Sequence, residues 1–177
     1  MKYLCLGATP ETDPGALAAI GQFLAAELDL PLRRIDLPAV DFAFDAGRKQ
    51  YASIAVLEML LRLCPDDALR LVAVTERDLF IPVLTFVFGH AQLGGRAAVV
   101  SLARLRQEFY GLEPNRDIFL DRARKEVLHE TGHTFGLVHC PERSCAMSLS
   151  TRVQQIDQKR AALCPACVRQ LSKGVMT

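Results

Sequence analysis

Side chains that commonly bind metal ions are concentrated in the last third of this 177-residue chain. Three of the four histidines and four of the six cysteines lie between residues 129 and 167. A metal site requires its ligands to meet at one point, so this clustering restricts the local fold more than any hydrophobic pattern does. The residues concerned are His129, His133, His139, Cys140, Cys145, Cys164 and Cys167.

The sequence HETGH at residues 129–133 places two histidines four residues apart, with a glutamate beside the first. In an α-helix both imidazoles lie on one face, one turn apart, and can reach one Zn²⁺ ion. Glu130 then lies beside the ion as a non-ligand, where a carboxylate can deprotonate a water molecule. Gly136 allows the helix to end, so that His139 can fold back as a third ligand. The alternative, ordinary core or surface side chains, is disfavoured by the eleven-residue spacing.

The four late cysteines form two close pairs, Cys140 with Cys145 and Cys164 with Cys167. Four thiolates with no further histidine are the ligand set of a closed, structural zinc site. Such a site would stabilise a short segment that has few apolar residues for a core of its own. Disulfides or free buried thiols are the alternatives. We favour zinc because no secretory signal is evident, which suggests a reducing, cytoplasmic location.

The overall composition excludes several classes of protein. The chain carries 21 Lys and Arg against 20 Asp and Glu, and half of its residues are hydrophobic. This argues against a disordered tail, a collagen and a protein that coats polyanions. No apolar run is long enough to predict a membrane-spanning helix. We therefore expect a soluble monomer that binds neither membranes nor nucleic acids.

Strand-like and helix-like stretches alternate over the first hundred residues, which favours an α/β fold with a mixed sheet. The last two predicted strands should pair as a hairpin, because Gly94 and Gly95 suit the positive φ of a tight turn. Five strands are predicted, over residues 2–6, 31–37, 69–74, 84–90 and 97–102.

Helices are predicted over residues 14–28, 48–63 and 115–135. Asn115 is a good N-cap for the third, which carries the histidine motif on a face separate from its core-facing stripe. The stripe recurs every four residues and comprises Phe119, Ala123, Val127, Thr131 and Phe135. In the second helix the residues predicted to face inward are Ile54, Leu57 and Leu61.

Two subdomains are expected. Residues 1–135 would form an N-terminal subdomain that ends with the helix of the histidine motif. Residues 136–177 would form a small C-terminal subdomain stapled by the four cysteines, with helical turns over residues 154–171.

The combined pattern is His-Glu-x-x-His-x-x-Gly-x-x-His, a directly following cysteine, Cys-x-Met, and a distal Cys-x-x-Cys. It resembles the archaemetzincins, a branch of the metzincin zinc peptidases, over residues 129–167. The resemblance implies that the three histidines bind a catalytic zinc, that Glu130 is the general base and that the four cysteines bind a second zinc. Met147, which alone would be read as a core residue, would form the Met-turn beneath the metal.

The resemblance also implies a metzincin-like twisted mixed sheet, with an antiparallel edge strand along which a peptide substrate lies. Residues 86–92 are the candidate for this strand, with Phe88, Gly89, His90 and Ala91 as contacts. Strand addition would give affinity through backbone hydrogen bonds. For His90, a surface or pairing residue without a catalytic part is the alternative.

The sequence thus predicts a zinc metallopeptidase that hydrolyses peptide or protein substrates. The alternative is a catalytically inert zinc-binding interaction protein that uses the four-cysteine element and a basic C-terminal face. Intact Glu130 argues against it, because an inert site has no reason to keep that carboxylate. Glu126, one turn earlier, is either a partner of a metal ligand or a solvated charge. The cations of the basic face are Arg143, Arg152, Lys159, Arg160, Arg169 and Lys173.

Overall fold

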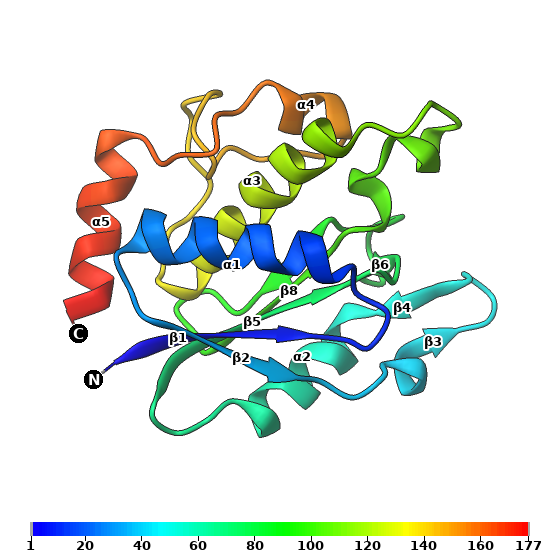
Figure 1. Ribbon diagram of the computed structural model, residues 1–177, viewed down its shortest axis with the longest axis horizontal. Helices are drawn as coiled ribbons and strands as arrows, with labels where there is room; N and C mark the ends of the chain where they lie inside the picture. The colour runs from blue at the N-terminus through cyan, green and yellow to red at the C-terminus, as the bar shows by residue number, and fades with distance from the viewer. Residues whose placement is uncertain (1, 177) are drawn as a thin grey trace.

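A twisted five-stranded sheet lies at the centre of the fold (Figure 1). The structure is a computed structural model that describes the backbone of residues 2–176 and the side chains of residues 2–173. Across the sheet the order is β2 (Leu32–Asp36), β1 (Tyr3–Ala8), β5 (Ala68–Thr75), β8 (Ala97–Ser101) and β7 (Gly89–Ala91). The first four strands are parallel, and β7 pairs antiparallel with β8. The predicted α/β class with a mixed sheet is confirmed.

Helices cover both faces of this sheet, as expected for parallel strands that are buried on both sides. Helices α1 (Pro14–Leu28) and α3 (Arg116–Thr134) lie on one face, and α2 (Ser53–Leu63) lies on the other (Figure 1). Successive side chains of a strand point to opposite faces. Leu4 and Leu6 of β1 therefore pack in the apolar cluster with α1 and α3, whereas Tyr3 and Cys5 pack in the cluster with α2.

The two edges of the sheet differ in their chemistry. At the β2 edge, Arg33 and Arg34 are exposed, and charged side chains discourage the pairing of a further strand. At the other edge, β7 pairs only with β8 among the strands that the structure describes. Strand β7 is therefore an edge strand of the sheet.

Helix α3 begins and ends where the sequence predicts. The side chain of Asn115 accepts a hydrogen bond from the backbone N–H of Ile118 at 3.0 Å and so caps the first turn. At the other end Gly136 has a φ of 89°, which a residue with a side chain rarely adopts. The predicted core stripe is buried along its whole length: Phe119, Ala123, Val127, Thr131 and Phe135.

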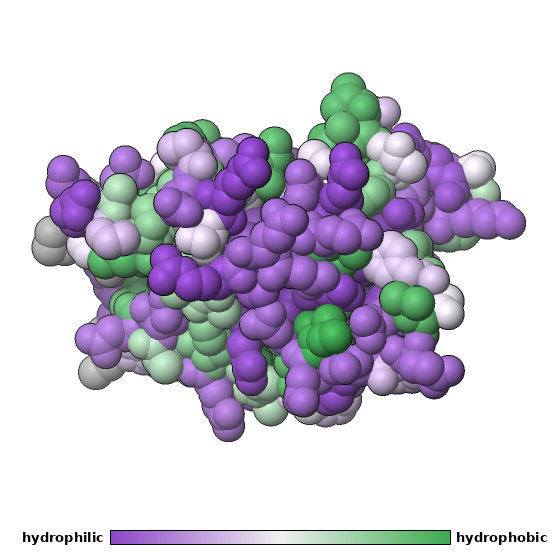
Figure 2. Space-filling model, turned by 90° about the horizontal axis from the view of Figure 1, so that it is seen from above, coloured by the Kyte–Doolittle hydropathy of each residue, from purple (hydrophilic) through white to green (hydrophobic). Residues whose placement is uncertain are grey.

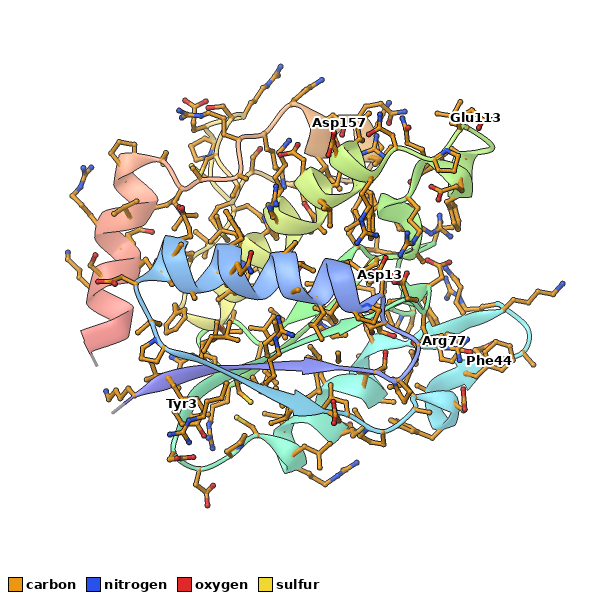
Figure 3. All side chains as sticks on the ribbon, in the orientation of Figure 1. Tyr3, Asp13, Phe44, Arg77, Glu113 and Asp157 are labelled. Atoms are coloured by element: carbon orange, nitrogen blue, oxygen red, sulfur yellow. The ribbon has the colours of Figure 1, made fainter. Side chains whose placement is uncertain are left out.

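The chain beyond Gly136 has little regular structure before two helices, α4 (Val153–Asp157) and α5 (Pro165–Met176). Its apolar residues form a third cluster around the cysteines, against Leu128 and Phe135 of the α3 end. Helix α4 is held above α3 by Arg122, which donates to both carboxylate oxygens of Asp157 at 2.7 and 2.8 Å. Asp157 is labelled on α4 in Figure 3. The helical region predicted over residues 154–171 thus consists of two separate helices.

A smaller three-stranded sheet lies beside the main one, with strands β3 (Phe44–Asp45), β4 (Gln50–Ala52) and β6 (Leu79–Phe80). Three short 3₁₀ helices also occur within residues 2–176: η1 (Asp41–Ala43), η2 (Ala103–Leu105) and η3 (Gln107–Tyr110). Within residues 2–176, no helix is long and apolar enough to cross a membrane.

The predicted start of the second helix at residue 48 is wrong, because α2 begins at Ser53. The residues before it form the β3–β4 hairpin, in which Lys49 has a φ of 56°. That conformation lies outside the right-handed helical region.

Two of the three residues predicted to face inward from this helix are also exposed, Ile54 by 46% and Leu61 by 39%. Only Leu57 is buried as predicted. The buried stripe starts at Ser53, whose hydroxyl donates to the carbonyl of Phe80 at 3.0 Å. Because the first buried position of α2 is polar, the hydrophobic pattern alone predicted the wrong residues to face the core.

The predicted hairpin is confirmed, but only Gly94 has the positive φ, 66°, that is expected of both turn glycines, and the first strand is shorter than residues 84–90. Strand β7 comprises only Gly89–Ala91, and the flanking residues Phe88 and Gln92 each form one further backbone hydrogen bond with the β8 side. The preceding chain bonds to the smaller sheet instead, where the backbone N–H of Val87 donates to the carbonyl of Leu79 at 2.9 Å. The segment just before β7 therefore lies against β6 of the smaller sheet.

Replacing the N-cap of α3 should destabilise the protein modestly. In Asn115→Ala the N–H of Ile118 loses its acceptor, and we expect the free energy of unfolding to fall by about 1 kcal/mol in urea denaturation. Asn115→Asp is the control, because its carboxylate also accepts this bond. An unchanged midpoint in the alanine variant would show that the cap contributes nothing.

Candidate metal centre and cleft

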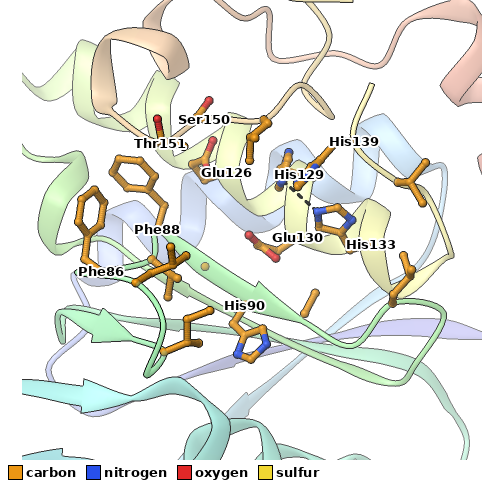
Figure 4. Close-up of a pocket in the computed structure, with 18 of the residues that line it drawn as sticks. Phe86, Phe88, His90, Glu126, His129, Glu130, His133, His139, Ser150 and Thr151 are labelled. Atoms are coloured by element: carbon orange, nitrogen blue, oxygen red, sulfur yellow. Dashed lines mark hydrogen bonds between the residues drawn. The ribbon is translucent and has the colours of Figure 1, made fainter. Parts of the chain in front are cut away.

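The structure brings the three predicted histidines together. His129 and His133 lie on one face of α3, and the left-handed turn at Gly136 returns the chain so that His139 faces them (Figure 4). Leu137 donates its N–H to the carbonyl of Gly132 at 3.0 Å, which closes this turn. One side-chain nitrogen from each of the three residues lies within 4.8 Å of the others.

The orientation of the first two imidazoles is set by backbone carbonyls. Nδ1 of His129 donates to the carbonyl of Ala146 at 2.8 Å, and Nδ1 of His133 donates to that of Leu137 at 2.7 Å. A carbonyl oxygen can only accept, so each Nδ1 carries the hydrogen. Burial lowers the pKa of both imidazoles and favours their neutral form. Each Nε2 atom is therefore left with a lone pair and no hydrogen.

These two Nε2 atoms lie 3.0 Å apart. Two lone pairs facing each other at that distance repel, unless a cation lies between them. In a tetrahedral zinc site with bonds of about 2.0 Å, ligand nitrogens lie about 3.3 Å apart. The spacing of the nitrogens of His129, His133 and His139 therefore fits a zinc ion.

Glu130 is buried beside the histidines and lines the same cleft. Burial raises the pKa of its carboxyl well above the usual range, the Glu126 carboxylate adds to this rise, and Lys159 opposes it. Gly89 of β7 lies against this side chain. A Cβ atom at that position would lie 2.5 Å from Cγ of Glu130, so any larger residue would displace the carboxylate.

Met147 lies against Gly132 of α3 and is fully buried. A Cβ on Gly132 would lie 2.5 Å from its sulfur, so the glycine inside the histidine motif gives Met147 its space. The carbonyl of Met147 accepts a hydrogen bond from the N–H of Cys140 at 3.0 Å. The loop that carries the methionine is thus closed by the first cysteine.

The four late cysteines also meet at one point, with all sulfurs within 4.8 Å of one another. The Sγ atoms of Cys140 and Cys164 lie 3.8 Å apart, as do those of Cys145 and Cys167. Disulfide bonds are about 2.05 Å long, whereas tetrahedral zinc with bonds of about 2.3 Å requires sulfurs about 3.8 Å apart. The N–H of Cys167 lowers the pKa of the Cys164 thiol to about 7, whereas burial raises the pKa of the Cys140 and Cys167 thiols.

A cleft of about 550 Å³ opens between β7 and α3 (Figure 4). All four predicted contacts of the edge strand, Phe88, Gly89, His90 and Ala91, line it. Ser53 at the start of α2 lies 2.9 Å from Nδ1 of His90, and burial lowers the pKa of that imidazole. The side chain of His90 is therefore tied to α2.

Sequence reasoning missed one buried ion pair beside the cleft. Nζ of Lys159 lies 3.2 Å from a carboxylate oxygen of Glu126, with side-chain exposures of 1% and 4%. The reading of Glu126 as a solvated charge is wrong, and Lys159 does not belong to a basic surface. The two residues are 33 positions apart, so no local pattern could have paired them.

Comparison with known proteins agrees with this structure. The profile of peptidase family M54 matches residues 18–173. The archaemetzincin of Methanocaldococcus jannaschii is 42% identical over 140 residues, which cover 79% of this chain and 75% of that protein. The archaemetzincin of Methanopyrus kandleri is 40% identical over 149 residues, which cover 84% of this chain and 80% of that protein.

Solved structures give the same result. The crystal structure of the Methanopyrus kandleri archaemetzincin superposes with a TM-score of 0.87 at 35% identity and covers 100% of this chain and 96% of its own. A zinc-dependent peptidase from Methanocorpusculum labreanum superposes with a TM-score of 0.85 at 30% identity and covers 95% and 99%. Fold and sequence together define a zinc metallopeptidase, a hydrolase whose substrates are peptides. The chain belongs to peptidase family M54, the archaemetzincins.

Adding a methyl group to Gly89 should impair peptide hydrolysis without removing metal. In Gly89→Ala the new Cβ displaces the Glu130 carboxylate, and a displacement of about 1 Å lowers kcat/KM by roughly tenfold to a hundredfold. Zinc content, measured by mass spectrometry, should not change. Gly47→Ala adds the same group in the exposed β3–β4 turn and is the control. Full activity in Gly89→Ala would mean that the carboxylate position is not critical.

Proposed function

We propose that His129, His133 and His139 bind one catalytic zinc ion, and that Glu130 is the general base in hydrolysis of a peptide bond. The observation that carries this proposal is the convergence of the two unprotonated Nε2 atoms at 3.0 Å, on the wall of an open cleft. The Glu130 carboxyl on the next residue supports it further, because a base must lie within reach of the attacking water.

When bound, zinc supplies a Lewis acid for the scissile carbonyl and lowers the pKa of a water molecule. Glu130 accepts a proton from the attacking water and delivers it to the leaving amine. The close approach of Gly89 limits the positions that this carboxylate can take, which reduces the reorganisation needed for proton transfer. The carbonyls of Ala146 and Leu137 hold the two imidazoles in the required tautomer.

The substrate is proposed to add as a strand along β7. Phe88 accepts a hydrogen bond from Ser101, and Gln92 donates one to Ala97, so both pair with β8. Hydrogen-bonded and non-bonded positions alternate in an antiparallel pair. Gly89 and Ala91 consequently direct their N–H and C=O groups away from β8, toward an added strand.

The four cysteines are proposed to bind a second, structural zinc ion, so that each chain holds two. Their spacing supports a closed site with no position for substrate. This zinc would staple residues 136–177 as a subdomain onto residues 1–135. Met147 would form the floor of the catalytic site, because it fills the space beside Gly132.

The inert interaction protein finds less support. It depends on a basic C-terminal face, yet Lys159 is buried against Glu126. An inert protein also does not explain why Glu130 is buried beside the cleft or why Gly89 packs closely against it.

Replacing the proposed base should abolish hydrolysis and retain both metals. Glu130→Gln keeps the shape of the side chain but cannot accept the proton, so kcat should fall about a thousandfold in a fluorogenic peptide assay. Glu27→Gln, on the exposed side of α1, is the matched control. Undiminished cleavage by Glu130→Gln would refute the proposed role of this carboxylate.

The two metal sites should be separable. Native mass spectrometry of the zinc-loaded protein should show two zinc ions, and His133→Ala and Cys145→Ser should each retain one. We expect the cysteine variant to lose more thermal stability, because a structural zinc contributes directly to folding. A single zinc in the parent protein after zinc is added would contradict the two-site proposal.

A further inference from the structure

A second hollow adjoins the cleft, which we call the α4 groove. It has a volume of about 760 Å³ and shares Leu149 with the cleft. Segment 148–152 separates the two, because Ser150 and Thr151 line the cleft whereas Ser148 and Arg152 line the groove. The α4 face of the molecule is mostly hydrophilic (Figure 2). The residues that line the groove are Arg143, Ser148, Leu149, Arg152, Gln154, Gln155 and Gln158.

The two arginines of the groove have fixed backbones. The side chain of Gln155 accepts hydrogen bonds from the N–H groups of Thr151 at 2.7 Å and Arg152 at 3.2 Å. Arg143 lies in a tight turn that Cys145 closes by donating its N–H to the carbonyl of Glu142 at 3.0 Å. Backbone hydrogen bonds therefore fix the position from which each arginine side chain extends.

No acidic residue of the described chain neutralises these guanidinium groups. Neither Arg143 nor Arg152 forms an ion pair within residues 2–173. The nearest acids in sequence do not line the groove: Asp157 binds Arg122, and Glu142 accepts a hydrogen bond from Ser144 instead of pairing with an arginine. The groove therefore carries uncompensated positive charge next to the cleft.

A carboxylate matches this chemistry best. An arginine can bind one through two parallel hydrogen bonds. The glutamine amides of α4 offer donors and acceptors that suit a peptide backbone. The groove contains no aromatic side chain on which a nucleic-acid base could stack, which disfavours a nucleic acid.

We propose that the α4 groove binds acidic side chains of the peptide substrate, and that the enzyme prefers peptides with Asp or Glu on one side of the scissile bond. A peptide that leaves the cleft past Leu149 enters the groove and meets Arg152 and Arg143. The groove meets the cleft only at Leu149, so only substrate residues on one side of the scissile bond can reach the two arginines. This inference rests on the proposed peptide hydrolysis and adds a substrate class to it.

The test uses quenched fluorescent peptides that share one core and carry a tail of glutamate, glutamine or lysine on either side. At low ionic strength the glutamate tail should lower KM about fivefold relative to glutamine on one side only, with kcat unchanged. The lysine tail should raise KM on that side. Salt at about 0.5 M should reduce both effects by screening.

Variants locate the effect. Arg143→Gln combined with Arg152→Gln should remove the preference for the glutamate tail and leave KM for the glutamine tail within about twofold. Arg169→Gln, an exposed arginine on α5, is the matched control and should retain the preference. An unchanged preference in the double variant, or none in the parent protein, overturns the inference.

A binding measurement tests the groove independently of the proposed catalytic mechanism. The same peptides are titrated into zinc-loaded Glu130→Gln protein and followed by fluorescence anisotropy. Tighter binding of the glutamate tail that depends on both arginines supports the groove even if no peptide is cleaved, and equal binding of all tails overturns it. Stronger arginine-dependent binding of a single-stranded oligonucleotide also overturns it.

Discussion

The hydrogen bond from His129 to the carbonyl of Ala146 joins the two halves of the active site. Ala146 lies between Cys145 and Met147, and its own N–H donates to the carbonyl of Ala162, just before the second cysteine pair. The four-cysteine cluster therefore determines where this carbonyl lies. Because the carbonyl sets the tautomer and direction of the imidazole, the folding of the cysteine loop determines whether the histidine nitrogens converge.

Two glycines allow close packing at this centre. Gly89 allows β7 to lie against Glu130, and Gly132 allows Met147 to lie against α3. Both positions are crowded, so neither can hold a Cβ without moving a side chain of the site. The arrangement is rigid through close packing, which is how a folded protein holds reacting groups in place before the substrate arrives.

Much of the site could be predicted from the sequence because its key residues are close together in the chain. His129, Glu130 and His133 lie within five residues on one helix, and helical geometry alone places them side by side. The register of α2 could not be predicted in this way. Its stripe begins at Ser53, which is buried because of a hydrogen bond to distant Phe80. A prediction that uses only the positions of hydrophobic residues therefore misses this buried serine and assigns the wrong face of α2 to the core.

The sequence by itself determined the metal-binding chemistry, the helix that carries it and the left-handed turn that ends the helix. These follow from local rules of spacing and backbone conformation. Only the tertiary structure decided that Gly89 faces Glu130, that Lys159 pairs with Glu126 and that Arg143 lies in one groove with Arg152. The first two contacts join residues more than thirty positions apart, and the third depends on how the loop that carries Arg143 folds against α4, so none of them follows from local conformation alone.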